Sequence, residues 1–203
     1  MADDVAGNNG AATATPPSTV RKLDGSEPAE LAGLAAVFED LQYVLRCCEH
    51  LVSALAPPQP DPALVEALWT GALIGYVRCF SGRAGVLTDD DLGRLELDGD
   101  VREFHGMIKK LRDHYASRHV NPRESFTIGV AQSNDGKPTG VAVVSTPRPL
   151  VDDTTVRLLG RVAYALSGLL DTRIQKTQND VLGAAGKLSP NDLSSLPVVH
   201  LSG

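Results

Sequence analysis

Aromatic residues and cysteines are scarce in this chain. Aromatic side chains make up 4% of the 203 residues, so the core must be built from Leu, Val and Ala, a composition that favours helices. Three cysteines, of which Cys47 and Cys48 are adjacent, do not form a disulfide framework. Cys79 lies in an apolar run, where we expect a small buried hydrophobe. This cysteine usage predicts a reducing, cytoplasmic environment.

Long apolar runs and an excess of basic charge are also absent. No apolar stretch reaches the roughly 18 residues that span a bilayer, and the first residues lack the apolar segment of a signal peptide. We therefore expect a soluble protein with no membrane partner. The net charge of −6 argues against a general nucleic-acid coat protein, because non-specific binding to a polyanion depends on basic charge. A local basic site is compatible with this balance.

The patterns that are present predict a mainly α fold. Residues 1–28 are rich in Ala, Gly, Asn, Thr and Pro and predict a disordered N-terminal tail. From residue 181 the chain is polar or interrupted by Pro, which predicts a flexible C-terminal tail over 181–203. Apolar spacing and turn residues predict helices and one β-hairpin, at 30–56, 63–80, 98–117, about 125–146 (hairpin) and 154–177. We expect a four-helix up-down bundle with the hairpin inserted between the third and fourth helices.

Positive side chains gather on the third predicted helix. His105, Arg112 and His119 are spaced seven apart, and seven steps of about 100° return to within about 20° of the same side of a helix. Lys109 lies one turn from Arg112, and Tyr115 connects this stripe to the edge of the core. The stripe predicts a site for an anion within an acidic chain.

The chemistry of an RNA phosphodiester suits these groups. A guanidinium can hold two phosphate oxygens and stabilise the charge that grows in the transition state. An imidazole with an ordinary pKa near 6.5 can accept the proton of a 2′-hydroxyl or donate one to the leaving oxygen, which is worth about 10²–10⁴ in rate. No metal or other cofactor is needed. The alternative is that cations at a helix C-terminus only complement the helix dipole.

The segment R-D-H-Y-A-S-R-H (112–119) resembles the R-x4–6-H signature of HEPN domains, with six residues between Arg112 and His119. Residues 76–83 and 111–121 look like uncharacterised bacterial members of the same superfamily. The resemblance covers about residues 30–175, so we expect a HEPN-like helical domain over 29–180. Those relatives place the histidine one residue earlier, where this chain has Arg118.

The resemblance implies an RNA-binding protein or a metal-independent endoribonuclease, as found in toxin–antitoxin, defence and stress systems. It implies a homodimer whose R/H motifs face each other, with RNA and an antitoxin or other protein as partners. In the catalytic roles that it implies, Arg112 grips the scissile phosphate, His119 acts on the 2′-hydroxyl or leaving group, and Asp113 orients the motif. The substrate-binding residues expected beside them are Lys109, His105, Tyr115 and Arg118.

A non-catalytic helical module that binds itself or a partner protein is the rival hypothesis. The excess of acids over bases and the lack of aromatic stacking residues near the stripe favour it. Two further clusters predict no metal site. Cys47, Cys48 and His50 lack the paired spacing of zinc ligands, and the acidic run 89–91 is more typical of a solvated loop or a helix cap than of a cation site.

Overall fold

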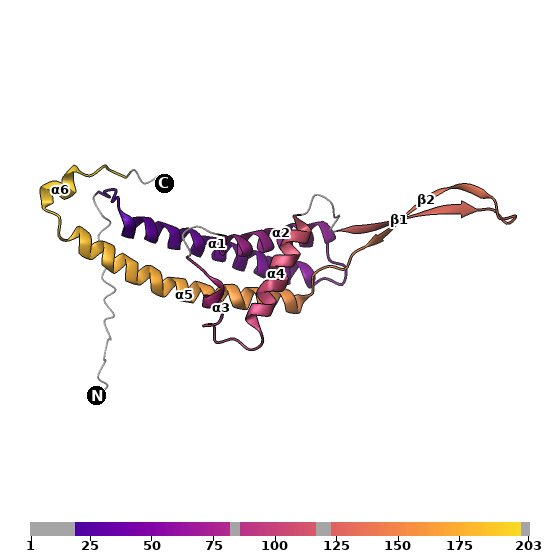
Figure 1. Cartoon of the computed structure of the whole chain (residues 1–203), viewed down its shortest axis with the longest axis horizontal. Helices are drawn as coiled ribbons and strands as arrows, with labels where there is room; N and C mark the ends of the chain where they lie inside the picture. The colour runs from indigo at the N-terminus through magenta and orange to yellow at the C-terminus, as the bar shows by residue number, and fades with distance from the viewer. Residues whose placement is uncertain (1–18, 82–85, 117–122, 200–203) are drawn as a thin grey trace, which may run out of the picture.

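Residues 19–81, 86–116 and 123–199 are described by the computed structural model of the chain (Figure 1). The prediction of a mainly helical chain with a small antiparallel hairpin is confirmed. The elements in chain order are α1 (Ser26–Leu55), α2 (Pro62–Arg78), α3 (Asp89–Leu92), α4 (Val101–Tyr115), β1 (Glu124–Gln132), β2 (Pro138–Pro147), α5 (Asp153–Ala185) and α6 (Pro190–Ser195).

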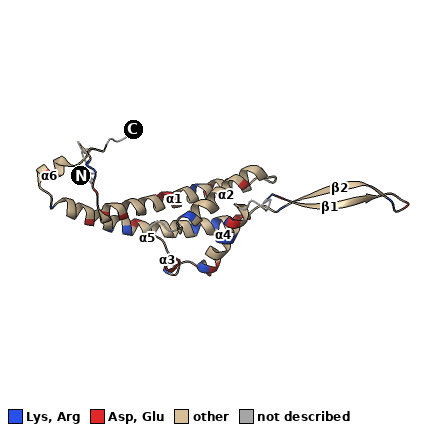
Figure 2. Cartoon of the chain, turned by 45° about the horizontal axis from the view of Figure 1, so that its top comes forward, with Lys and Arg blue, Asp and Glu red and all other residues tan. Residues whose placement is uncertain are grey.

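Helix α1 is the centre of the helical body. It packs against α5 and against α2, and α2 in turn packs against α4. Helices α1 and α5 lie side by side and run in opposite directions, whereas α4 stands at a steep angle to them in both views (Figures 1 and 2). The finer prediction of an up-down bundle of four helices is therefore not confirmed.

The core is mostly aliphatic, as the scarcity of aromatic residues predicts, although Trp69 and Tyr76 are its two largest fully buried side chains. Its fully buried side chains come mainly from the three helices that contact one another most closely, α1, α2 and α5. They include Leu41, Val44, Leu51, Trp69, Leu73, Tyr76, Leu159, Leu166 and Leu170. All three cysteines are free and buried, in agreement with the prediction that they form no disulfide framework.

Aspartates begin three of the long helices. Asp61 accepts a hydrogen bond from the backbone N–H of Ala63 at 2.9 Å, and Pro62 occupies the first position of α2, where its missing N–H costs nothing. Asp100 and Asp152 cap α4 and α5 in the same way. Each cap satisfies N–H groups that have no partner within the helix.

Helical structure extends into the predicted C-terminal tail, residues 181–203. Helix α5 continues past residue 177 to Ala185, because an interior glycine such as Gly183 costs only about 1 kcal/mol relative to alanine. Residues 190–195 form α6, and the following segment pairs with residues before α1. There the N–H of Lys22 donates to the carbonyl of Pro197 at 2.8 Å. Of the predicted N-terminal tail, residues 1–18 lie outside the described residues.

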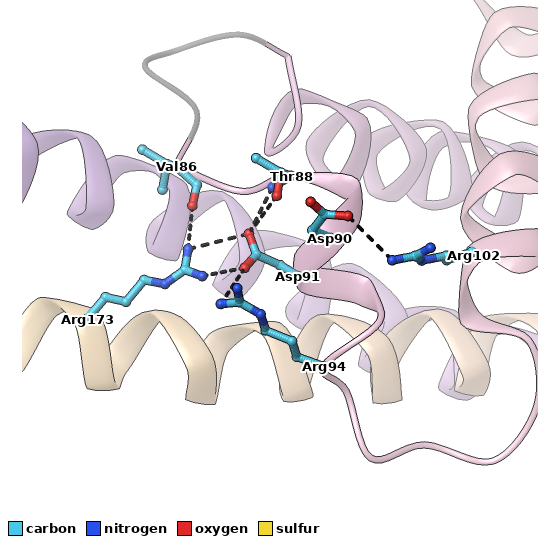
Figure 3. A network of polar contacts seen from close by, with 7 residues as sticks. All are labelled: Val86, Thr88, Asp90, Asp91, Arg94, Arg102 and Arg173. Carbon is cyan, nitrogen blue, oxygen red and sulfur yellow. Dashed lines mark hydrogen bonds and ion pairs between the residues drawn. The ribbon is translucent and has the colours of Figure 1, made fainter.

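A partly buried ion pair ties the short helix α3 to α5 (Figure 3). The carboxylate of Asp91, a residue that is 4% exposed, contacts the guanidinium of Arg173 and accepts the backbone N–H of Thr88 at 2.9 Å. Arg173 also donates to the carbonyl of Val86 at 2.7 Å. Burial raises the pKa of Asp91, but the hydrogen bonds from Arg173 and Thr88 outweigh it and hold the pKa below its ordinary value. Asp91, the last residue of the acidic run, thus completes a capping box with Thr88 at the start of α3.

We predict that Arg173→Met lowers the free energy of unfolding by about 3 kcal/mol, because the buried carboxylate of Asp91 loses its nearest cation and keeps only Arg94, whose Nη1 lies 3.7 Å away. This loss of stability is greatest above about pH 3.9, which is the ordinary pKa of an aspartate in the unfolded chain. It becomes smaller as the pH falls through the lower pKa of Asp91 in the folded chain, because Asp91 is then protonated. Urea denaturation at several pH values measures it. Arg157→Met on the same helix is the control, because the Arg157–Asp153 pair is exposed. Equal losses in both variants would contradict the assignment.

Candidate functional site

The structure separates the members of the predicted anion-binding stripe. His105 is 3% exposed, and its Nδ1 lies 3.0 Å from the hydroxyl oxygen of Tyr76. Its ring packs against Phe80 in a tilted arrangement, with 4.4 Å between ring centroids and 59° between the ring planes. His105 therefore belongs to the contact between α2 and α4. This burial argues against the expectation that His105 binds substrate, which stays a prediction; its Nε2 makes no hydrogen bond and lies 3.5 Å from Oδ1 of the exposed Asp89.

The remaining stripe residues lie at the C-terminal end of α4. Lys109 and Asp113 are exposed, and the Arg112 side chain is 38% exposed. The buried Nε of Arg112 has no hydrogen bond, although Asp113 Oδ1 lies 3.3 Å away. Tyr115 is half-buried and lines a cavity beside α2.

The predicted catalytic residues lie partly outside the described part of the chain. His119 and Arg118 lie outside the described residues, which end at residue 116 before they resume at 123. Of the three predicted catalytic residues, Arg112 and Asp113 are brought together, as sequence neighbours. The geometry that would join Arg112 to a proton-transferring histidine stays a prediction.

Neither metal chemistry nor thiol chemistry finds support in the helical body. Within residues 19–81, 86–116 and 123–199, no three His, Cys, Asp or Glu side chains gather as metal ligands would. Cys47 and Cys48 are buried whereas His50 is exposed. Burial raises the pKa of Cys48 and of Cys79 to about 12, so neither is a thiolate at neutral pH.

The hairpin formed by β1 and β2 projects from one end of the helical body as an arm, residues 124–147 (Figure 1). Its strands pair antiparallel, with Ile128 opposite Val143 and Val130 opposite Val141. Every residue of β2 is exposed. The ladder is closed by a turn in which Gly136 has a φ of 81°, a conformation that glycine adopts without strain. The arm is therefore held by its own hydrogen bonds rather than by the core.

One face of this arm is apolar and uncovered. Because side chains alternate between the faces of a strand, the register places five large apolar side chains together, and we call them the apolar face. They are Phe126, Ile128, Val130, Val141 and Val143, which are 55%, 65%, 67%, 74% and 65% exposed. In Figure 2 the arm carries charged residues only near its tip and its base.

The opposite face of the arm is different in character. It presents mostly small or hydroxyl side chains, namely Ser125, Thr127, Gly129, Ala131, Gly140, Ala142 and Thr146, together with Val144. The two faces thus differ in their capacity for hydrophobic contact. The sequence patterns predict the strands, and the alternation of Phe126, Ile128 and Val130 is the signal of an apolar face that our expectations did not include.

The chain matches no protein-family model, no curated protein and no solved structure. No helix in the described part of the chain is both long and apolar enough to cross a membrane.

We predict that His105 makes stability depend on pH. Burial lowers its pKa, Lys109 lowers it further, and the Asp89 carboxylate acts in the opposite sense. Because the folded-state pKa lies below the ordinary value of about 6.5, the unfolded chain binds the proton first. The free energy of unfolding is therefore fully retained above pH 6.5 and decreases as the pH falls from 6.5 toward the folded-state pKa.

Chemical denaturation of the wild type and of His105→Gln between pH 7.5 and about 5 measures this dependence. The variant is less stable by about 1–2 kcal/mol, since Tyr76 loses its buried partner, but its stability changes less with pH. The control is His50→Gln, at an exposed position of α1, which should keep the wild-type slope. An unchanged slope in His105→Gln would show that this imidazole is not the titrating group.

Proposed function

We propose that this protein is a non-catalytic interaction protein that self-associates through the apolar face of its hairpin arm. The observation that carries the proposal is the exposure of five large apolar side chains on one face of an isolated two-stranded ladder. A two-stranded hairpin is marginally stable at best in water, and it gains independent stability from a further strand or a covering layer. The arm therefore needs a partner surface.

The size of the apolar face agrees with a weak, specific interface. At the observed exposures it presents roughly 500 Å² of apolar surface, toward the upper end of the patches found on monomers. Two such faces packed together would bury about 1,000 Å² in total, near the lower limit for a specific interface. We expect a dimer with a dissociation constant on the order of 1–10 µM.

Charge favours a second copy as the occupant. The five residues of the apolar face carry no charge, so identical faces can approach without repulsion. Glu124, at the base of the same side of the ladder, accepts a hydrogen bond from Ser145 at 2.8 Å. Each copy presents the same uncovered face, and a two-fold axis would let each cover the other.

Sedimentation equilibrium of the full chain tests this proposal. We predict a dimer for the wild type at about 100 µM and at least a roughly 100-fold weaker association for Ile128→Lys, because a lysine ammonium is desolvated at the centre of the interface. The control, Thr127→Lys, places the same charge one residue away on the opposite face and leaves the dimer intact. Circular dichroism checks that the helical body of each variant is folded.

A monomeric wild type at about 100 µM would overturn the proposal, since that concentration exceeds the expected dissociation constant about tenfold or more. Equal weakening by both substitutions would also overturn it, because the association would then not use the apolar face. If the wild type is monomeric, a different protein would be the next candidate to cover the apolar face.

A second candidate is RNA binding of the HEPN-like kind, with or without metal-independent cleavage. The observation that favours it is the exposed, positively charged end of α4, where Lys109 and Lys110 precede Arg112. These cations can hold phosphate oxygens. The burial of His105 removes one of the two predicted imidazoles, so catalysis would depend on His119. A place in a toxin–antitoxin, defence or stress system follows only from the resemblance.

Cleavage of end-labelled RNA in EDTA tests this second candidate. If the R-x6-H motif is catalytic, Arg112→Ala and His119→Ala each reduce the rate by at least about 100-fold, and the wild-type products carry 2′,3′-cyclic phosphate ends. Lys137→Ala, at the tip of the arm, removes a cation far along the chain from the motif and serves as the control. Equal background cleavage in all four samples would rule out the nuclease.

A further inference from the structure

A cavity of about 640 Å³ lies where the helical body meets the hairpin arm. Its walls come from the first turns of α2, the end of α4, the base of the arm and the segment that leads into α5. This volume lies within the range of roughly 300–1,000 Å³ that is typical of small-molecule sites. The cavity is separate from the apolar face, so its role does not depend on the proposed self-association.

The inner wall of the cavity is apolar and rigid. Val65 and Trp69 on α2 are 1% and 2% exposed, so they belong to the core and present a fixed surface to the cavity. Leu150 and Val151, from the segment before α5, line the same cavity, and Pro149 restricts the backbone there. A ring-sized apolar body fits such a wall.

Two polar groups at this cavity have unused hydrogen-bonding capacity. Tyr115 is half-buried, and its hydroxyl makes no hydrogen bond with any described residue. Burial raises the pKa of Tyr115, the Glu66 carboxylate raises it further and Arg148 opposes them, so the hydroxyl is a donor at neutral pH. The guanidinium of Arg148 is exposed and forms no ion pair with another described side chain.

The acidic groups around the cavity are already engaged. Glu66 Oε2 lies 3.5 Å from Nε of Arg123, and Asp61 accepts the N–H groups that begin α2. Glu124 accepts the hydroxyl of Ser145. Three carboxylates and two guanidiniums line the cavity, and Arg148 is the cation among them that forms no ion pair with a described side chain. Its backbone N–H donates to the carbonyl of Arg123 at 2.7 Å, which fixes the position of its main chain.

From these observations we infer that the cavity binds a small organic anion with an apolar ring, of the aryl-carboxylate class. The ring packs against Val65 and Trp69, and the carboxylate accepts hydrogen bonds from the Arg148 guanidinium and the Tyr115 hydroxyl. Because the walls come from both the helices and the base of the arm, the bound anion contacts both parts of the molecule.

Trp69 provides the readout, since it is the only tryptophan of the chain. We would titrate the full-length protein with phenylacetate and follow the tryptophan emission, with isothermal calorimetry as a second measurement. Phenylacetamide keeps the ring and removes the charge, and phenyl phosphate replaces the carboxylate with a larger anion. The inference predicts saturable binding of phenylacetate and at least about tenfold weaker binding of phenylacetamide. Phenyl phosphate bound more tightly than phenylacetate would overturn the assignment to carboxylates.

Arg148→Gln removes the charge at nearly constant size, and we expect about 10–100-fold weaker binding of phenylacetate. Tyr115→Phe weakens binding by about 3–10-fold, the value of one hydrogen bond. The control, Arg161→Gln on the exposed side of α5, should leave the affinity unchanged. The inference is overturned if phenylacetate causes no saturable change, or if Arg148→Gln and Arg161→Gln behave alike.

Discussion

The packing of α1 between α2 and α5 is the constraint on which the rest of the molecule depends. Leu41, Val44 and Leu51 of α1 are completely buried, and this contact orders the two helices that position everything else. Helix α2 carries Tyr76, which fixes α4 through His105. Helix α5 carries Arg173, which anchors α3 through Asp91. The polar contacts set the positions of the smaller elements, but the aliphatic packing gives them helices to attach to.

This arrangement divides the chain into two parts with different needs. The helical body buries its own apolar side chains, whereas the arm leaves its apolar face to solvent. A body of this kind can be stable alone, but two strands without a covering layer cannot contribute much stability. The same division explains why the cavity lies at the junction, where the base of the arm meets α2 and α4 without filling the space between them.

The sequence predicted the helices and the hairpin because their signals are local. Apolar periodicity and the capping aspartates Asp61 and Asp152 depend only on neighbouring residues. In contrast, what covers each face of a helix or strand depends on residues that are distant in the sequence. A spacing of seven places His105 and Arg112 on one side of α4, but the end of α2 covers only the first of them. Likewise, the alternation of side chains along the two strands predicts that Ile128 and Val143 share a face. It does not predict what covers that face. For the same reason the resemblance to HEPN domains, which depends on residues 112–119, stays a prediction.

The central claim is that the arm depends on a second copy for its cover. Hydrogen–deuterium exchange of the full chain at concentrations from about 1 µM to about 100 µM tests it most directly, because this range brackets the expected dissociation constant. The account predicts that amides of β1 and β2 become more protected as the concentration rises, whereas the amides in the middle of α1 are equally protected throughout. Protection of the arm that does not change with concentration would contradict the account.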